Sequence, residues 1–441
     1  MPTSRFSPWT LVFVAVWVAA SVYAWTYLDR GWVPHDEGTL ALSAERVMSG
    51  MVPHVDYDEV YTGGLAYAGA AAFRVLGVDL FTLRLLLFAV FVGWIPVVYW
   101  CARRFATPPL AGVTTLLAGA WSIPCYSAAM PSWFNLFFSV FAGGCLLRYL
   151  ENPRRRWLVG AGMAAGLSIL VKIVGLYLVA GCLLALTFFE QSSVTNRVNE
   201  EDSGSRLFSM LLTAGAGLLV ALVWTVVGRA PGPEVLVHFL LPVAALCAWL
   251  VITEWKLPTS RALIRIKGTI SLFVPFLLGV MLPVLAFLIP YAWQGELGEL
   301  YRGLFVDPTL RFEYATRRPP HLRTLLAIVP LLFILGASWS QPHKSRVRIA
   351  GLLAALGGML LFNGNGIRIY SEVWFSMRNL APVVIVGGIG VLWLSRWRQG
   401  GAKHLSHLGS RAIVQRRELR LLTLLCITGF VSPVSYTHLT L

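Results

Sequence analysis

The sequence has 441 residues, of which 57% are hydrophobic and only 13% are charged. Soluble domains carry about 25% charged residues, so this composition excludes an ordinary soluble enzyme. The formal net charge of +15 does not indicate nucleic-acid binding, because the basic residues are dispersed between apolar runs. We therefore expect an all-α polytopic membrane protein with the lipid bilayer, and no nucleic acid, as its surroundings.

The chain begins with an apolar run over 8–28 that predicts an uncleaved first membrane span, since it is too long for the apolar core of a signal peptide. An acidic segment over 29–83 follows and is too highly charged to enter lipid. Inside it, 39–48 has apolar residues on one face and predicts an amphipathic helix. Asp36 and Glu37 stand just before this helix, whose N-terminus favours their ionised forms.

Eleven further apolar runs predict spans, because a bilayer core needs about 20 apolar residues per helix. They fall near 82–101, 108–125, 132–150, 157–171, 173–189, 207–228, 235–253, 268–291, 322–340, 348–363 and 381–395. A thirteenth run starts at Leu421. The stretch 157–189 is predicted as two helices with a tight turn at Lys172, since two helices preserve the alternation of inner and outer segments.

The distribution of Lys and Arg predicts the orientation. With the N-terminus inside, the inner segments hold 23 of the 36 Lys and Arg residues. Three long segments, 29–83, 294–321 and 364–380, then lie on the outer face of a bacterial cytoplasmic membrane. We expect the chemistry on that face, built from outer loops and juxtamembrane helices.

The last eight residues, VSYTHLTL at 434–441, look like a translated sequencing adapter, and we expect them to be non-native. The transmembrane domain then covers 1–433. It comprises about 12 complete spans and a thirteenth that is truncated near Pro433.

The acidic turn is the strongest candidate for chemistry. A carboxylate at a membrane surface, aimed by the end of a helix, suits a general base. The alternative interpretation of Asp36 and Glu37 is an N-cap with a solvated acidic neighbour. Spacing alone leaves both interpretations open.

A resemblance favours the interpretation as a general base. An apolar span, then PHDEG, then an amphipathic helix ending in SGMVPHVDY, resembles the first outer loop of the GT-C glycosyltransferases. The resemblance is to the dolichyl-phosphate-mannose–protein mannosyltransferase and ArnT-like branch, and it continues in FRVLGVDLFTLRLLLF, GLSILVKIVGLYLVAG and YAWQGELGELYRGLFVDP. It implies a polyprenyl-phosphate sugar donor and Asp36 as the base, with Glu37 beside it.

Cations on the outer side are candidates to hold the donor phosphate, because a phosphate leaving group needs positive charge or hydrogen-bond donors. The candidates are Lys172, Arg302, Arg368 and Arg378. The alternative for each is contact with lipid headgroups. The family also has a basic residue that meets the donor phosphate, but the resemblance matches it to no single position here.

His35 and Asp56, with other acidic residues nearby, are candidates for a divalent metal site. The resemblance leaves metal dependence open, since some relatives need a metal and others do not. Many relatives carry a second acidic residue after the third span, where this chain has Asn135 and no carboxylate. We expect that no cofactor is required and that a divalent metal is possible.

The resemblance thus implies inverting transfer of a sugar from a polyprenyl-phosphate donor to an acceptor hydroxyl of a lipid, glycan or protein. The alternative is a lipid-linked sugar flippase or a secondary transporter, which would need charged residues near mid-depth in its spans. A polysaccharide polymerase or ligase is a second alternative.

Overall fold

A computed structural model describes residues 8–195, 205–227, 232–257, 261–307, 380–401 and 408–436. The expected spans at 322–340 and 348–363, and nearly all of the outer segment 364–380, lie outside the described residues. Within the described ranges the regular secondary structure is helical, and the β-interaction found there is an isolated bridge between Pro53 and Tyr57.

The long helices up to α18 follow the predicted apolar runs, whereas α19 begins at Leu408, before the run expected from Leu421. Their bounds are α1 Pro8–Trp25, α2 Pro34–Met48, α3 Gly64–Leu76, α4 Leu80–Ala102, α5 Pro108–Ala120, η1 Ile123–Cys125, α6 Pro131–Glu151, α7 Arg155–Val171, α8 Gly175–Thr195, α9 Leu207–Val227, α10 Pro233–Val235, η2 Leu236–Leu240, α11 Leu241–Trp255, α12 Ala262–Gln294, α13 Leu297–Tyr301, η3 Arg302–Val306, α18 Leu380–Gly401 and α19 Leu408–Tyr436. The prediction of two helices joined near Lys172 is confirmed by α7 and α8.

Six of the described helical segments are long and apolar enough to cross a bilayer, namely Leu80–Ala102, Pro131–Glu151, Gly175–Ser193, Leu207–Thr225, Pro233–Trp255 and Ala262–Gln294. Helices α1, α3 and α18 contain shorter apolar stretches. The protein is therefore a helical membrane protein, while the expected number of 12 to 13 spans stays a prediction. At about 1.5 Å per residue, the 33 residues of α12 extend about 50 Å, well beyond a hydrocarbon core of about 30 Å.

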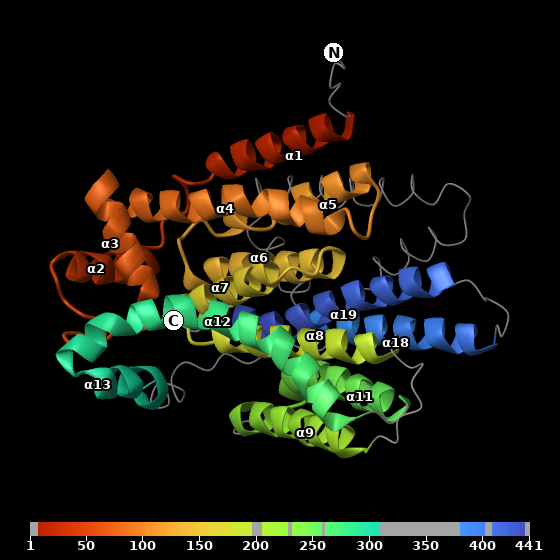
Figure 1. The fold of residues 1–441 in the computed structure, drawn as a ribbon. Coiled ribbons are helices and arrows are strands. Elements are labelled where there is room, and N and C mark those ends of the chain that lie inside the picture. Colours follow the sequence, from red (N-terminus) through yellow and green to blue (C-terminus); the bar gives the residue numbers. More distant parts are fainter. Residues whose placement is uncertain are drawn as a thin grey trace, which may run out of the picture.

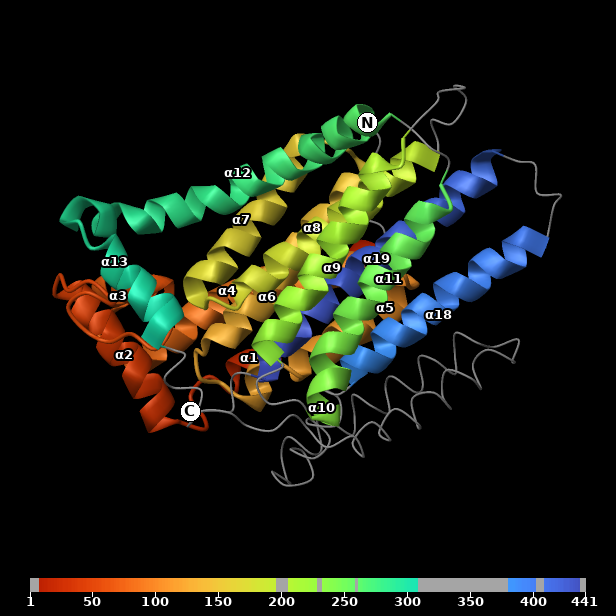
Figure 2. The same cartoon turned by 90° about the horizontal axis from the view of Figure 1, so that it is seen from below.

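The helices pack into one bundle with a separate group of short helices at one end. Helices α1, α4 and α5 form one side of the bundle, α9 and α11 lie on the opposite side, and α6, α7 and α8 lie between them (Figure 1). One buried apolar cluster contains residues of α1, α2, α3, α4 and α6. A second contains residues of α6, α7, α8, α11, α12, α18 and α19. Helices α2, α3 and α13 gather at the end of the bundle that α12 reaches with its C-terminus (Figure 2).

Close backbone packing holds α7 against α12. A Cβ atom added at Gly162 would lie 1.9 Å from the carbonyl oxygen of Phe276, and one at Gly279 would lie 2.2 Å from that of Val159. Small residues at such contacts let helix backbones approach in a membrane. The glycines of α7 therefore serve close packing against α12.

Candidate functional site

The site begins at the first turn of α2. This turn lies earlier in the chain than the sequence predicts. The helix was expected over 39–48 but starts at Pro34, whose fixed φ suits the first helical turn. Asp36 and Glu37 consequently lie inside the first turn and not before it. The side chain of Glu37 accepts a hydrogen bond from the backbone N–H of Val33 at 2.9 Å, which satisfies a donor at the helix start.

Glu37 is buried in an ion pair with Arg84 of α4. Nε of Arg84 donates to Oε1 of Glu37 at 2.5 Å, and Nη2 donates to Oε2 at 2.7 Å. The side chains are 0% and 2% exposed. Both oxygens of Glu37 are therefore occupied, and its side chain faces the protein interior.

Asp36 projects in a different direction from Glu37 and keeps a limited opening to solvent. Its side chain is 13% exposed, and Oδ2 accepts a short hydrogen bond from the hydroxyl of Tyr126, which precedes α6. Oδ1 lies 3.4 Å from Nε2 of His35, whose side chain is 71% exposed. One oxygen of Asp36 is thus held by a phenol, while the other faces an exposed side chain and can receive a further donor.

The segment that carries Tyr126 is itself anchored. The indole Nε1–H of Trp133 donates to the backbone carbonyl of Tyr126 at 2.8 Å. The neighbouring Ser127 hydroxyl donates to the carbonyl of Arg30 at 2.6 Å, in the linker between α1 and α2. Burial, followed by the hydrogen bond to Asp36, raises the pKa of Tyr126 above its usual value, so this phenol remains a donor at neutral pH.

Tyr61 lies near both Asp36 and Lys172. The ammonium of Lys172 sits 5.6 Å from the centre of the Tyr61 ring. Burial and then the nearby carboxylates of Asp36 and Glu59 raise the pKa of Tyr61. Burial also lowers the pKa of Lys172 to about 8. A carboxylate and a desolvated cation thus lie near one phenol at the C-terminal end of α7.

A further buried carboxylate belongs to the same region. Glu59 is 4% exposed, and its Oε1 accepts a hydrogen bond from the backbone N–H of Tyr61 at 3.1 Å. Burial first, and the charge of Glu59 second, raise the pKa of Tyr57. Glu59 therefore acts on both Tyr57 and Tyr61.

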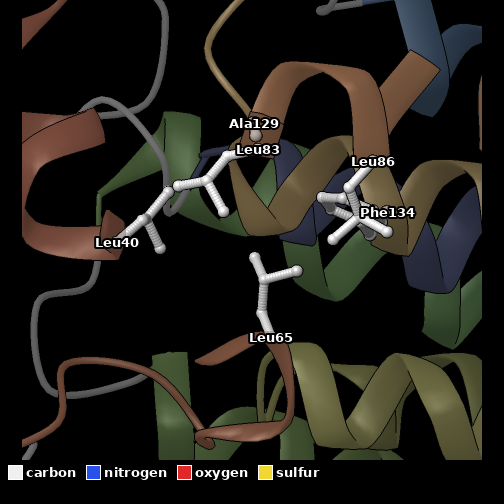
Figure 3. Close-up of a pocket in the computed structure, with 6 residues that line it drawn as sticks. All are labelled: Leu40, Leu65, Leu83, Leu86, Ala129 and Phe134. Atoms are coloured by element: carbon white, nitrogen blue, oxygen red, sulfur yellow. The ribbon is translucent and has the colours of Figure 1, made fainter. Parts of the chain in front are cut away.

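A small apolar cavity lies beside the first turns of α2. It is lined by Leu40, Leu65, Leu83, Leu86, Ala129 and Phe134, which come from α2, α3, α4, α6 and the segment before α6 (Figure 3). Leu40 follows Asp36 by one helical turn. Because its lining side chains are aliphatic and aromatic, this cavity offers no side chain for the polar step of a reaction.

The structure brings only part of the predicted site together. Asp36, Glu37 and Lys172 belong to the region described above. Arg302 lies on η3, is exposed, and pairs with Asp307 at 3.6 Å. Arg368 and Arg378 lie outside the described residues, so their predicted role in holding the phosphate stays a prediction.

The predicted metal ligands do not form a recognisable centre. Asp56 is exposed, and its Oδ2 accepts a hydrogen bond from the backbone N–H of Val52 at 2.7 Å. Among the described residues, no group of three or more His, Cys, Asp or Glu side chains gathers in a way that could hold a metal ion. Asn135 accepts a hydrogen bond from the Ser168 hydroxyl at 3.0 Å and lies buried between α6 and α7. A divalent metal bound by His35 and Asp56 stays a prediction.

Two residues of this site, Arg84 and Tyr126, were not predicted. Arg84 had a visible signal, because an arginine within an apolar run is costly and needs a partner. Tyr126 had none, since it is one of 14 tyrosines and lies 90 residues from Asp36.

Comparison with known proteins gives limited similarity. No protein-family model and no curated protein matches the sequence significantly. Among solved structures, the chain is similar to the Archaeoglobus fulgidus oligosaccharyltransferase in its apo form, with 15% identity, a TM-score of 0.39 and coverage of 98% of this chain and 57% of that chain. The oligosaccharyltransferase AglB from Archaeoglobus fulgidus, in complex with an inhibitory peptide and a dolichol-phosphate, gives 15% identity, a TM-score of 0.36, and coverage of 96% of this chain and 56% of that chain.

ArnT from Cupriavidus metallidurans bound to undecaprenyl phosphate gives 18% identity, a TM-score of 0.33, and coverage of 86% of this chain and 81% of that chain. These solved structures are GT-C glycosyltransferases, the superfamily that the sequence resemblance named. The chain spans little more than half the length of the oligosaccharyltransferases. Identities and TM-scores this low describe a general likeness in helical architecture and carry no information on the activity of this chain.

Proposed function

We propose that this protein is a membrane glycosyltransferase that moves a sugar from a polyprenyl-phosphate donor to an acceptor hydroxyl on the outer face of the cytoplasmic membrane. The observation that carries the proposal is the Asp36 carboxylate, which Tyr126 binds through one oxygen, in the same region as the Lys172 ammonium beside Tyr61. Glycosyl transfer needs a base for the acceptor and positive charge for the departing phosphate, and these two side chains supply one of each.

The proposed reaction is a single displacement. The acceptor hydroxyl binds to Oδ1 of Asp36, the oxygen that Tyr126 does not occupy. As the acceptor oxygen attacks the anomeric carbon, its proton passes to Asp36 and the bond from that carbon to the phosphate oxygen breaks. The polyprenyl phosphate leaves with the bonding electrons, and the anomeric configuration is inverted.

Lys172 is proposed to stabilise the phosphate as its negative charge grows. A buried ammonium is effective there because charges interact more strongly where water is excluded. Its lowered pKa, about 8, still leaves it mostly protonated at neutral pH. Arg368 and Arg378 remain further candidates for the same phosphate.

Glu37 is proposed to act through position and not as the base. Both of its oxygens accept hydrogen bonds from Arg84, and one also accepts from Val33. A carboxylate held in this way has little capacity left for an acceptor hydroxyl. Asp36, which the resemblance implied as the base, and Glu37 beside it therefore receive different roles.

The alternative of a flippase or transporter is less well supported. In the six candidate spans, the buried charged residues are close to helix ends, as Arg84, Glu190, Glu254 and Arg265 illustrate. A transport pathway would place such residues near mid-depth. The described part of the chain therefore favours chemistry at a membrane surface.

The proposal is tested by incubating purified protein with a panel of polyprenyl-phosphate sugars and candidate acceptors and measuring the released polyprenyl phosphate. Acceptor-dependent release with at least one donor supports glycosyl transfer. Movement of an intact donor between leaflets without release would instead support a flippase.

A further inference from the structure

Arg84 uses its whole hydrogen-bonding capacity inside the protein. A guanidinium has five N–H donors. Nε and Nη2 donate to Glu37, Nη1 donates to the carbonyls of Leu28 and Arg30 at 2.7 Å each, and Nη2 also donates to the carbonyl of Gly31 at 3.3 Å. The side chain is completely buried, and the Trp32 ring covers it, with its centre 3.7 Å from the guanidinium carbon.

These acceptors belong to one continuous stretch of chain. Leu28 follows the end of α1, Arg30 and Gly31 form the linker, and Glu37 lies in the first turn of α2. Gly31 has φ of +63°, in the left-handed region, so the linker turns sharply beneath the guanidinium. One side chain of α4 therefore fixes the path by which the chain enters α2.

This path determines where Asp36 points. Neighbouring residues of a helix project about 100° apart, so fixing Glu37 toward Arg84 fixes the direction of the residue before it. Tyr126 donates to the Asp36 carboxylate, and Ser127 donates to the same Arg30 carbonyl that Arg84 binds. The carboxylate of Asp36 is thus held between two anchored segments.

We infer that Arg84 is a positioning residue for the reaction, which holds the carboxylate of Asp36 in the direction required for proton transfer by clamping Glu37 and the linker before α2. The inference rests on the proposed function and assigns a role to a residue that does not itself meet the substrate. The competing explanation is that the ion pair only stabilises the fold.

The physics of buried ion pairs separates the two explanations. Removing one partner leaves an uncompensated charge and destabilises strongly, whereas replacing both partners by apolar residues of similar volume is often neutral for stability. The double variant Arg84→Met/Glu37→Met should therefore stay folded but lose the clamp. Arg84→Lys keeps a positive charge but has only three donors and no planar fork, so it cannot reproduce the five bonds.

The experiment compares both variants with the wild type in three measurements: thermal melting, binding of a polyprenyl-phosphate donor, and kcat at saturating donor and acceptor. A small displacement of a reacting group costs up to about 100-fold in rate. We expect kcat to fall about 10- to 100-fold in each variant, with a melting temperature near that of the wild type for the double variant and a donor Kd changed less than about threefold.

Arg265→Lys is the matched control. Arg265 is also a buried arginine, 3% exposed, and donates two hydrogen bonds to Glu190 and two to Glu254. It lies in the first turn of α12, at the opposite end of that helix from α2 and α3 (Figure 2). This variant should lower the melting temperature and leave kcat unchanged.

A folded double variant with wild-type kcat would overturn the positioning role while leaving the proposed function intact. If the double variant does not fold, Arg84→Lys supplies the test: wild-type kcat in this variant would overturn the positioning role. A wild-type protein that turns over no donor of the panel would overturn the proposed function, and the inference with it.

Discussion

The hydroxyl of Tyr126 donates a hydrogen bond to Oδ2 of Asp36, joining the segment before α6 to the first turn of α2. This contact leaves Oδ1 as the oxygen available to an acceptor. The two residues are 90 positions apart, so the carboxylate is oriented by tertiary structure and not by its own loop.

Tyr126→Phe tests this relationship. The ring remains, and the bond from Trp133 to the backbone carbonyl of residue 126 is unaffected, so the fold should be preserved. Without the phenol, the carboxylate of Asp36 can rotate, and we expect kcat to fall about tenfold with little change in donor binding. Tyr149→Phe, in a helix distant in sequence from α2, is the control. Equal kcat in Tyr126→Phe and wild type would contradict the orienting role.

The charge of Lys172 gives a pH dependence. Its pKa in the folded protein is about 8, below the value of about 10.4 for an unfolded lysine, because burial disfavours the ammonium. Between these values the unfolded chain binds more protons, so the contribution of Lys172 to folding stability increases as pH rises. Donor binding requires the ammonium form of Lys172. The donor therefore binds most tightly below pH 8, and its binding weakens as pH rises through 8.

We therefore expect the donor Kd of the wild type to increase about tenfold between pH 7 and pH 9. Lys172→Arg should lose this dependence, since arginine stays protonated throughout the range. Lys172→Met should bind the donor weakly at both pH values. A flat wild-type profile, or tight binding by Lys172→Met, would remove Lys172 from the phosphate site.

Much of the fold could be predicted from the sequence, because apolar runs of about 20 residues report membrane helices directly. The division at Lys172 and the helical character of each described run followed from this pattern and from the distribution of basic residues. The start of α2 was predicted five residues too late. The prediction relied on a periodic apolar face, and the first turn, with Pro34, Asp36 and Glu37, contributes no residue to that face. Proline at the helix start was the available signal.

The site could be predicted only in part. Asp36 and Glu37 were found together, but which of them is free for chemistry depends on Arg84 and Tyr126, which reach them from other helices. Sequence spacing contains no information on such contacts. Lys172 was found because a helix junction within a long apolar run is visible, whereas the position of Tyr61 beside it is a tertiary result.

Helix packing gives a prediction independent of the proposed reaction. Gly162→Ala would place a Cβ against the backbone of Phe276 and should destabilise the protein by about 1–3 kcal/mol, the usual cost of overpacking. Gly217→Ala, at a position in α9 with no neighbouring atom within 4 Å, should be neutral or slightly stabilising. Thermal melting in detergent measures both. Similar melting temperatures for the two variants would contradict the close contact of α7 with α12.

Topology can be tested by chemical labelling. In a background without the six native cysteines, Ser49→Cys at the end of α2 should react with an impermeant reagent from the outer side of intact cells. Lys256→Cys, after α11, should react only once the membrane is opened. Both positions are exposed, so access is limited by the bilayer alone. Exchanged reactivities would reverse the predicted orientation.

The central claim is that Asp36 is the base of a glycosyl transfer, and the most direct measurement is the single-turnover rate of Asp36→Asn with a donor and acceptor that the wild type uses. Asparagine keeps the shape but removes the proton acceptor, so the rate should fall by about 10²–10⁴ while donor binding survives. Glu45→Gln, at an exposed position of the same helix, should transfer at the wild-type rate. Transfer by Asp36→Asn at close to the wild-type rate would contradict the account.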